Sequence, residues 1–306
     1  MKGLELSKKY FEAYGREMLA QFPALEKEYA AGLVGRGSEC FGFDDEISKD
    51  HDYGPSFCIW LKRDVYEQFG QKVQEAYEQM PAEFLGVPGR VTEETGRGRV
   101  GVLCLEDFYY GLLGTCQVPE TKLEWFRLQD ENLSTATNGA VFEDPCGAFS
   151  RMRDGFLSYY PEDVRVKKIV ACLARMARAG QYNYMRAMRR DERVAAGLFL
   201  HEFIRESMRL VYLLNRRYAP FDKWIHRGMK SLPSCSEIGD MILLFYQVEK
   251  AEDKVLIIEA ICNIIVQELN AQGLSNLEDN FLQNHLLSVT EKIEDETLRN
   301  MQFLEG

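Results

Sequence analysis

The pattern of hydrophobic and polar positions divides the chain into two stretches of different character. Before about residue 145, short apolar runs bounded by glycine alternate with amphipathic stretches, and such runs are typical of buried strands. Four strands are predicted, at residues 30–35, 52–61, 96–105 and 139–144. From Pro161 onward nearly every apolar position recurs at helical spacing.

The same periodicity predicts the helices. Ser7 is placed to cap a first helix that runs to about Phe22. Further long helices are predicted at residues 64–80, 162–179, 198–218, 236–250, 254–271 and 277–304. The fold class is therefore α+β, with a mixed-sheet domain over residues 1–150 followed by an α-helical bundle domain over residues 151–306.

Composition and charge narrow the function classes. The 306 residues are 46% hydrophobic and 28% charged, which is typical of a soluble globular protein. The net charge of −11 argues against a nonspecific nucleic-acid binder. No apolar run reaches the length of a membrane span, and the polar N-terminus lacks the apolar core of a signal peptide.

Cysteine usage indicates the compartment. The eight cysteines are scattered and form no C-x-x-C pair, so neither a zinc site nor a redox dithiol is indicated. Several lie inside apolar runs, where a free thiol behaves as a small hydrophobic side chain. This usage fits a reducing cytosol and predicts a cytoplasmic protein.

One acidic stretch suggests chemistry. Asp50 and Asp52 stand two residues apart at the head of a predicted buried strand, so their carboxylates are expected on the same side of it. Like charges repel there, and a divalent cation such as Mg²⁺ would offset the repulsion. Gly37 and Ser38 follow the preceding strand, where a backbone N–H and a hydroxyl can bind a phosphate oxygen. The alternative is an ordinary solvated acidic turn.

These residues carry a resemblance to a known superfamily. The letters GRGS at 35–38, followed by DHDYGPSFCIWL at 50–61, resemble the nucleotidyltransferase superfamily of DNA polymerase β. The stretch is more similar to an uncharacterised bacterial family that shows GRGSE, GFDDE and DHDWGPR, with a later NRRY and KW stretch like NRRYAPFDKW at 215–224. Two positions depart from that pattern, because Tyr53 replaces tryptophan and Ser56 replaces an arginine expected near a phosphate.

The resemblance implies a reaction and its cofactor. Members of the superfamily transfer a nucleoside monophosphate from a nucleoside triphosphate to an acceptor, with Mg²⁺ or Mn²⁺, which Asp50 and Asp52 would bind. Antibiotic adenylyltransferases have a similar layout, so the helical domain is expected to bind the acceptor, a small molecule or a protein. A nucleotide-binding or regulatory protein that has lost turnover is the alternative. The nucleotidyltransferase of a toxin–antitoxin pair is a third, less well matched by a chain with its own helical domain.

The superfamily usually has a third carboxylate on a neighbouring strand. Glu106 directly follows the predicted strand at 96–105 and is the first choice, as a catalytic residue. Asp144 ends the strand at 139–144 and is the second. Asp107 is a further candidate, although it is equally suited to cap a helix. Absence of a third carboxylate also stays open.

Basic residues in the second half are candidates for the triphosphate. Lys223 and Arg227 cluster with Arg216 and Arg217, and guanidinium groups grip phosphates bidentately. For the two arginines at 216 and 217, the alternative is that they complement the dipole of the long helix that they end. Trp224 is favoured as an aromatic anchor that packs within the bundle.

Overall fold

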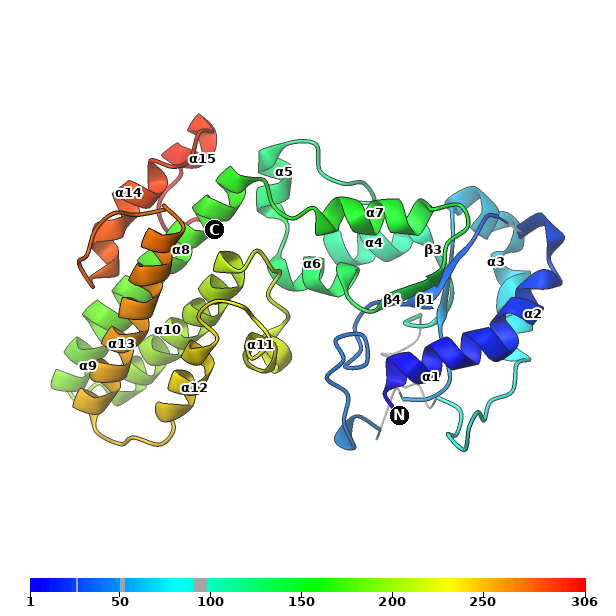
Figure 1. Cartoon of the computed structure of the whole chain (residues 1–306), viewed down its shortest axis with the longest axis horizontal. Helices are drawn as coiled ribbons and strands as arrows, with labels where there is room; N and C mark the ends of the chain where they lie inside the picture. Colours follow the sequence, from blue (N-terminus) through cyan, green and yellow to red (C-terminus); the bar gives the residue numbers. More distant parts are fainter. Residues whose placement is uncertain (26, 50–52, 91–97) are drawn as a thin grey trace. The chain divides into compact units, whose positions relative to one another are not determined.

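The structure, a computed structural model, describes residues 1–306 except for residues 26, 50–52 and 91–97 (Figure 1). Within the described residues, no helix is both long and apolar enough to cross a membrane. Strands lie in the first half and helices fill the second, so the predicted α+β class is confirmed. Among the described residues no strand follows residue 143.

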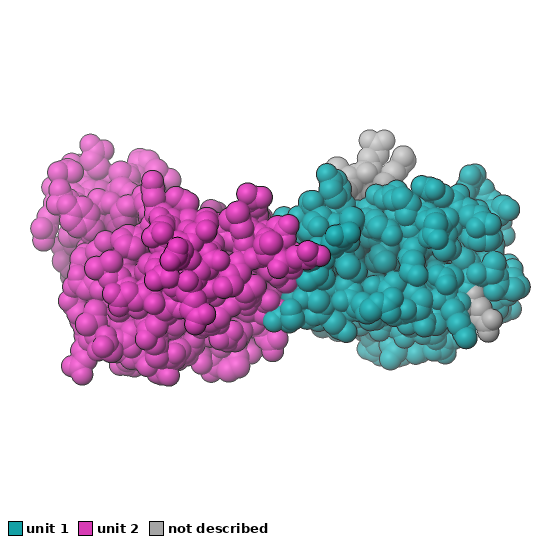
Figure 2. Space-filling model, turned by 90° about the horizontal axis from the view of Figure 1, so that it is seen from above, with its two compact units in different colours: residues 1–118, 132–158 teal, residues 119–131, 159–306 magenta. Residues whose placement is uncertain are grey.

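The chain divides into two compact units, which Figure 2 colours separately. The sheet unit comprises residues 1–118 and 132–158, and the helical unit comprises residues 119–131 and 159–306. Compared with the predicted ranges, the segment 119–131 groups with the helical unit instead of with the sheet. The segment 151–158 groups with the sheet unit instead of with the bundle.

The sheet unit is built on four short strands in the order β3-β2-β1-β4. Strands β2 and β3 run parallel, whereas β1 is antiparallel to both β2 and β4. Its elements are α1 (Gly3–Tyr10), a π-helix (Phe11–Gly15), α2 (Arg16–Ala20), β1 (Ala30–Leu33), β2 (Cys58–Leu61), α3 (Arg63–Glu78), β3 (Gly101–Cys104), α4 (Leu105–Leu113), β4 (Ala140–Glu143) and α7 (Ala148–Leu157). The short helix α6 (Asp130–Thr137) starts in the helical unit and ends in the sheet unit.

Helices cover both faces of this sheet (Figure 1). Ile59 and Val102 face a buried aromatic and aliphatic cluster contributed by α1, α2 and α3. Trp60 points to the other face, as the alternation along a strand requires. Its ring stacks on Phe149 of α7 with the ring centroids 4.0 Å apart, and it contacts Phe108 of α4 edge-on. The sheet is therefore a buried central layer.

The role predicted for Ser7 is wrong. Ser7 lies inside α1 and is buried, and its hydroxyl donates a hydrogen bond to the carbonyl oxygen of Ser56 at 2.6 Å. The helical stretch begins earlier, at Gly3, and continues through the π-helix to Ala20. Ser7 therefore connects the first helix to the segment that precedes β2.

The long helices α8, α10 and α13 form the core of the helical unit. Its elements are α5 (Lys122–Arg127), α8 (Glu162–Met176), a π-helix (Ala177–Tyr184), α9 (Met185–Arg189), α10 (Arg193–Leu214), α11 (Asp222–Met229), α12 (Glu237–Leu244), α13 (Ala251–Ala271), α14 (Leu286–Thr290) and α15 (Glu296–Asn300). All eight cysteines of the chain, which the structure describes in both units, are free.

The single long helix predicted at 277–304 is wrong. A 3-10 turn (Leu282–His285), α14 and α15 replace it. The side chain of Asp295 accepts a hydrogen bond from the backbone N–H of Leu298 and so starts α15 as a new helix. The carboxylate of Asp163 on α8 accepts from the N–H groups of Glu294 and Asp295. These bonds fix a turn where the apolar periodicity alone suggests a continuous helix.

Candidate functional site

Strand directions bring several chain segments to one edge of the sheet. Gly32 of β1 pairs with Cys58 of β2, and Cys58 pairs with Gly101 of β3. Leu33 pairs with Ala140, the first residue of β4. The end of β1 and the starts of β2, β3 and β4 therefore share one edge. We call it the Gly-Ser edge, because the described residues 34–38, 53–57, 98–100 and 138–139 lie there.

Gly37 and Ser38 form the start of a tight turn at this edge. The carbonyl oxygen of Gly37 accepts from Cys40 N at 3.1 Å, and that of Ser38 accepts from Phe41 N at 3.2 Å. Within the described residues, the N–H groups of Gly37, Ser38 and Glu39 donate no hydrogen bond. Successive N–H groups at the start of a turn make a concavity suited to an anion, as predicted for a phosphate oxygen.

The segment before β4 holds this turn in place. Asn138 forms two hydrogen bonds with Gly35, one from its Nδ2 atom to the glycine carbonyl at 2.8 Å and one to its Oδ1 atom at 2.9 Å. Gly139 donates to the carbonyl oxygen of Cys40 at 2.8 Å. A Cβ atom at Gly139 would lie 1.9 Å from the carbonyl oxygen of Leu33, so only glycine fits. The turn is therefore anchored from two sides.

A buried ion pair lies beside the turn. Glu39 and Arg90 are both almost fully buried, and Arg90 Nη1 lies 3.4 Å from Glu39 Oε1. The same nitrogen donates to the hydroxyl of Ser56 at 3.2 Å. Gly54 permits this arrangement, because a Cβ there would lie 2.6 Å from the backbone nitrogen of Arg90. A guanidinium from a distant loop thus reaches Ser56, the position where the resemblance expects an arginine.

Glu39, Arg90 and Asn138 are residues that the sequence analysis missed. Glu39 directly follows Ser38 in the GRGSE letters, so its place in this motif could have indicated it. Arg90 and Asn138 stand in loops 52 and 100 residues beyond Ser38, and no local pattern marks them. Only the tertiary contacts identify them.

The predicted metal ligands Asp50 and Asp52 lie outside the described residues. The strand that was predicted to start at Asp52 starts at Cys58, and residues 53–57 are not part of it. Alternation along β2 therefore does not place the carboxylates of Asp50 and Asp52, because both residues precede its first residue. The two aspartates still precede β2, the strand whose first residue lies at the Gly-Ser edge. Within the described residues, no group of three potential metal ligands occurs.

The structure does not bring Glu106 together with Gly37 and Ser38. Because β2 and β3 are parallel, Leu61 pairs with Cys104 and both strands end at the opposite edge of the sheet. Glu106 follows as the second residue of α4, roughly 10 Å or more along the strand from the Gly-Ser edge. Its Oε2 atom accepts a hydrogen bond from the thiol of Cys104 at 3.2 Å.

The two other candidate carboxylates also lie at that opposite edge. Asp144 follows β4, and its Oδ2 atom accepts from Ser150 N at 2.7 Å in the first turn of α7. Asp107 forms an ion pair with Arg63, and this hydrogen bond lowers the pKa of the Asp107 carboxyl. Both carboxylates therefore have local structural partners.

The thiols next to the Gly-Ser edge are not nucleophiles. Cys40 and Cys58 are buried. Burial raises the pKa of the Cys58 thiol to about 12 and that of Cys40 well above its usual value. Both groups are therefore neutral at physiological pH, whereas the thiolate is the reactive form.

Lys223 and Arg227 belong to α11 of the helical unit. They flank the buried ring of Trp224, with Lys223 Nζ 4.9 Å and the Arg227 Cζ 5.6 Å from the ring centroid. Trp224 thus packs within the bundle, as favoured from the sequence. Arg216 forms an ion pair with Glu162 at 2.7 Å. Binding of nucleotide by Lys223 and Arg227 stays a prediction.

Comparisons with known proteins give two matches. Residues 125–225 match a family described as a domain of unknown function, DUF4037. The structure is similar to that of a nucleotidyltransferase-like protein from Exiguobacterium sibiricum 255-15, at 10% sequence identity and a TM-score of 0.36, over 94% of this chain and 81% of that one. No curated protein matches the chain. The Gly-Ser edge lies almost entirely outside the segment 125–225, which holds the start of β4 and much of the helical unit.

Proposed function

We propose that this chain is a nucleotidyltransferase that uses Mg²⁺ or Mn²⁺ to move a nucleoside monophosphate from a nucleoside triphosphate to an acceptor. One observation carries the proposal. The Gly37–Ser38 turn, with N–H groups that make no hydrogen bond within the described chain, lies at the same sheet edge as the segment that leads from Asp50 and Asp52 into β2. Phosphate binding and charge neutralisation are what this chemistry needs most.

In this proposal each group has a role. The N–H groups of Gly37 and Ser38, with the Ser38 hydroxyl, hold phosphate oxygens of the triphosphate. Asp50 and Asp52 hold the divalent ion, which neutralises phosphate charge when bound. Lys223 and Arg227 are the further candidates for phosphate contact. The acceptor hydroxyl oxygen forms a bond to the α-phosphorus and its proton passes to solvent. The bond between the α-phosphorus and the oxygen that bridges it to the β-phosphorus breaks, and pyrophosphate leaves.

A nucleotide-binding protein without turnover is the second candidate. It is favoured by the position of Glu106, Asp107 and Asp144 at the opposite edge of the sheet. A reaction with an acceptor hydroxyl also needs a group that aligns and deprotonates it. Within the described residues, Glu39 is a buried carboxylate beside the Gly37–Ser38 turn, and it is already paired with Arg90.

Labelled nucleotide separates the two candidates. The purified chain is incubated with Mg²⁺ and each α-labelled nucleoside triphosphate, together with small-molecule extracts and protein acceptors. Transfer of label that is lost in the Asp50→Asn plus Asp52→Asn variant supports the enzyme. The matched control is Glu46→Gln, which removes an exposed carboxylate of the same acidic stretch. Stabilisation by the magnesium nucleotide without any labelled product supports the binding protein. If the chain shows neither stabilisation nor transfer, both candidates are contradicted.

A further inference from the structure

A pocket of about 230 Å³ lies within the helical unit, and the proposed transfer assigns it no role. Its nine lining residues come from the segment 129–131, from α10, and from the segment 219–225. All nine fall inside residues 125–225, so the match to DUF4037 spans the whole pocket. Its volume is smaller than the ~300 Å³ at which drug-sized pockets begin, so it suits one small molecule.

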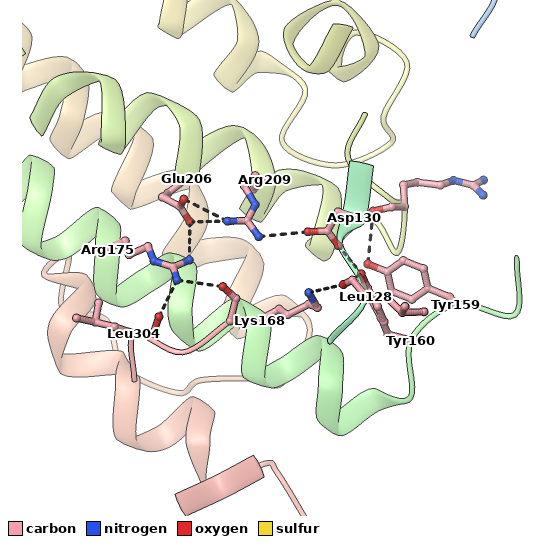
Figure 3. A network of polar contacts seen from close by, with 11 residues as sticks. Leu128, Asp130, Tyr159, Tyr160, Lys168, Arg175, Glu206, Arg209 and Leu304 are labelled. Carbon is pink, nitrogen blue, oxygen red and sulfur yellow. Dashed lines mark hydrogen bonds and ion pairs between the residues drawn. The ribbon is translucent and has the colours of Figure 1, made fainter. Parts of the chain in front are cut away.

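Asp130 and Arg209 line the pocket as a buried pair. The side chain of Asp130 is 7% exposed, and that of Arg209 is 21% exposed. Asp130 Oδ1 accepts a hydrogen bond from the Tyr160 hydroxyl at 2.7 Å, and Oδ2 accepts from Arg209 Nη2 at 3.3 Å (Figure 3). Arg209 Nη1 also donates to Glu206 at 3.3 Å. Both charged groups are therefore fixed by protein partners.

A second layer of contacts holds this pair rigid. Glu206 also pairs with Arg175 at 3.4 Å. Lys168 donates to the carbonyl oxygen of Leu128 at 3.2 Å, and its ammonium lies 5.0 Å from the centroid of the Tyr160 ring. Figure 3 shows side chains of α8 and α10 converging on Asp130, the first residue of α6. A network of this kind preorganises Asp130 and Arg209 for a ligand.

The remaining hydrogen-bonding capacity indicates the ligand chemistry. A carboxylate accepts about four hydrogen bonds and a guanidinium donates five, and the protein contacts of Asp130 and Arg209 use only part of each. A hydroxyl group both donates and accepts, so two neighbouring hydroxyls match an adjacent carboxylate and guanidinium. Pro220 and Ile225 add an apolar wall, against which the C–H face of a ring can pack.

The charge balance of the lining disfavours a strongly charged ligand. Arg205 at the rim forms an ion pair with Asp222 at 2.9 Å, so each lining arginine has a carboxylate partner. The lining holds three carboxylates and two guanidinium groups, and the third carboxylate, that of Glu131, is exposed to solvent, which screens its charge. Among these lining residues, a phosphate would meet only guanidinium groups that already have carboxylate partners, and a polyamine would meet carboxylates that are paired with arginine or screened by solvent.

We propose that this pocket binds a small neutral polyhydroxylated molecule, of the size of a monosaccharide or a cyclitol. Two neighbouring hydroxyls of the ligand bind to Asp130 and Arg209, and its ring packs on Pro220 and Ile225. The inference concerns binding alone and does not depend on nucleotidyl transfer.

The test uses saturation-transfer NMR and calorimetry on the full chain, without nucleotide or divalent metal. D-glucose, D-ribose and myo-inositol are the neutral probes, and citrate and spermidine are the charged ones. Gln129→Trp places a large ring at an exposed lining position and should block the pocket without disturbing the core. Gln247→Trp, at an exposed position outside the pocket in the same unit, is the matched control. Asp130→Asn removes the charged acceptor.

We expect at least one neutral probe to bind to the wild type and to Gln247→Trp, and binding to be lost in Gln129→Trp. Asp130→Asn should weaken binding about tenfold or more, the scale for losing a charged hydrogen-bond partner. Equal binding to Gln129→Trp and wild type would place the ligand elsewhere and overturn the proposal. Binding of citrate or spermidine alone would overturn it as well. So would binding of none of the probes at about 50 mM, a concentration far above a dissociation constant of about 1 mM.

Discussion

Arg90 and Glu39 form a buried ion pair, 3.4 Å apart, beside the turn that starts at Gly37. Gly37 and Glu39 belong to one short motif, whereas Arg90 comes from a loop more than fifty residues later. The pair therefore ties that loop to the Gly-Ser edge. The Glu39 carboxylate lies so close to Gly37 that a Cβ atom added at Gly37 would be 2.5 Å from it. The first two predictions follow from this contact.

Removing one member of the pair should destabilise the sheet unit. Arg90→Met leaves the buried carboxylate of Glu39 without this cation, which costs about 3 kcal/mol or more of the free energy of unfolding. Arg90→Met combined with Glu39→Gln should recover part of that loss, because no unpaired charge remains. Urea unfolding of the single and double variants measures the coupling.

Lys49→Met, which breaks the exposed pair with Glu46, is the control and should cost less than about 1 kcal/mol of the free energy of unfolding. Additive effects of the two buried changes would show that the pair does not interact.

Gly37→Ala should impair nucleotide binding more than folding. The added methyl group would displace the Glu39 carboxylate, which can move because it ends a flexible side chain. We expect the affinity for magnesium nucleotide to fall about tenfold or more, since small displacements at such sites have large effects. Gly111→Ala is the control, because nothing lies within 4 Å of a Cβ there. Calorimetric titration of both variants decides the matter, and equal affinities would remove Gly37 from the proposed phosphate site.

Glu106→Gln tests the carboxylate that the sequence favoured. Because Glu106 lies at the opposite edge of the sheet, we expect the rate of transfer to stay within about twofold of wild type, as for a residue outside the catalytic site. Asp52→Asn should lower transfer by at least about a hundredfold if it holds the metal ion. The assay is transfer of labelled nucleotide beside an equilibrium binding curve. A hundredfold loss in Glu106→Gln with intact binding would restore Glu106 as a catalytic residue.

The sequence predicted the strands better than it predicted which carboxylates lie near Gly37 and Ser38. Short apolar runs mark all four strands, because a buried strand needs little more than such a run. The choice of Glu106 required the direction of β3 relative to β2, and no local pattern encodes the direction of a neighbouring strand. Arg90 reaches Ser56 through a long-range contact that hydrophobic periodicity does not report. Asp163 likewise breaks an apparently continuous helix from a distance of more than 130 residues.

Asp163 should make the helical unit sensitive to acid. Burial alone would raise the pKa of Asp163, but the Lys122 ammonium and the N–H groups of Glu294 and Asp295 together hold the pKa below its usual value. A folded pKa below the unfolded value of about 3.9 contributes stability above that pH, and this is lost as the pH falls through the folded pKa. Asp163→Asn should therefore cost about 1–3 kcal/mol at pH 7 and less at pH 3, where the carboxyl is already mostly protonated in the unfolded chain.

Unfolding of wild type and Asp163→Asn in urea at both pH values measures this difference. Asp253→Asn, an exposed aspartate in the first turn of α13, should change the free energy of unfolding by less than about 0.5 kcal/mol. A constant difference between wild type and Asp163→Asn from pH 7 to pH 3 would contradict the assigned ion pair.

Cys58 should report nucleotide binding at the Gly-Ser edge. It is the first residue of β2, and burial raises the pKa of its thiol to about 12, so iodoacetamide at pH 8 should modify it only when the sheet unit opens. The exposed thiol of Cys116 should react at once and serves as the internal standard. A ligand that binds only the native state lowers the open population, so magnesium nucleotide at ten times its dissociation constant should slow Cys58 modification about tenfold.

Cys262, buried in the helical unit, is the matched control, and mass spectrometry of digested samples follows all three rates. Slowing at Cys58 alone would locate nucleotide binding in the sheet unit. Slowing at both thiols would add the helical unit, and with it Lys223 and Arg227, whereas protection of Cys262 alone would contradict a phosphate site at Gly37 and Ser38.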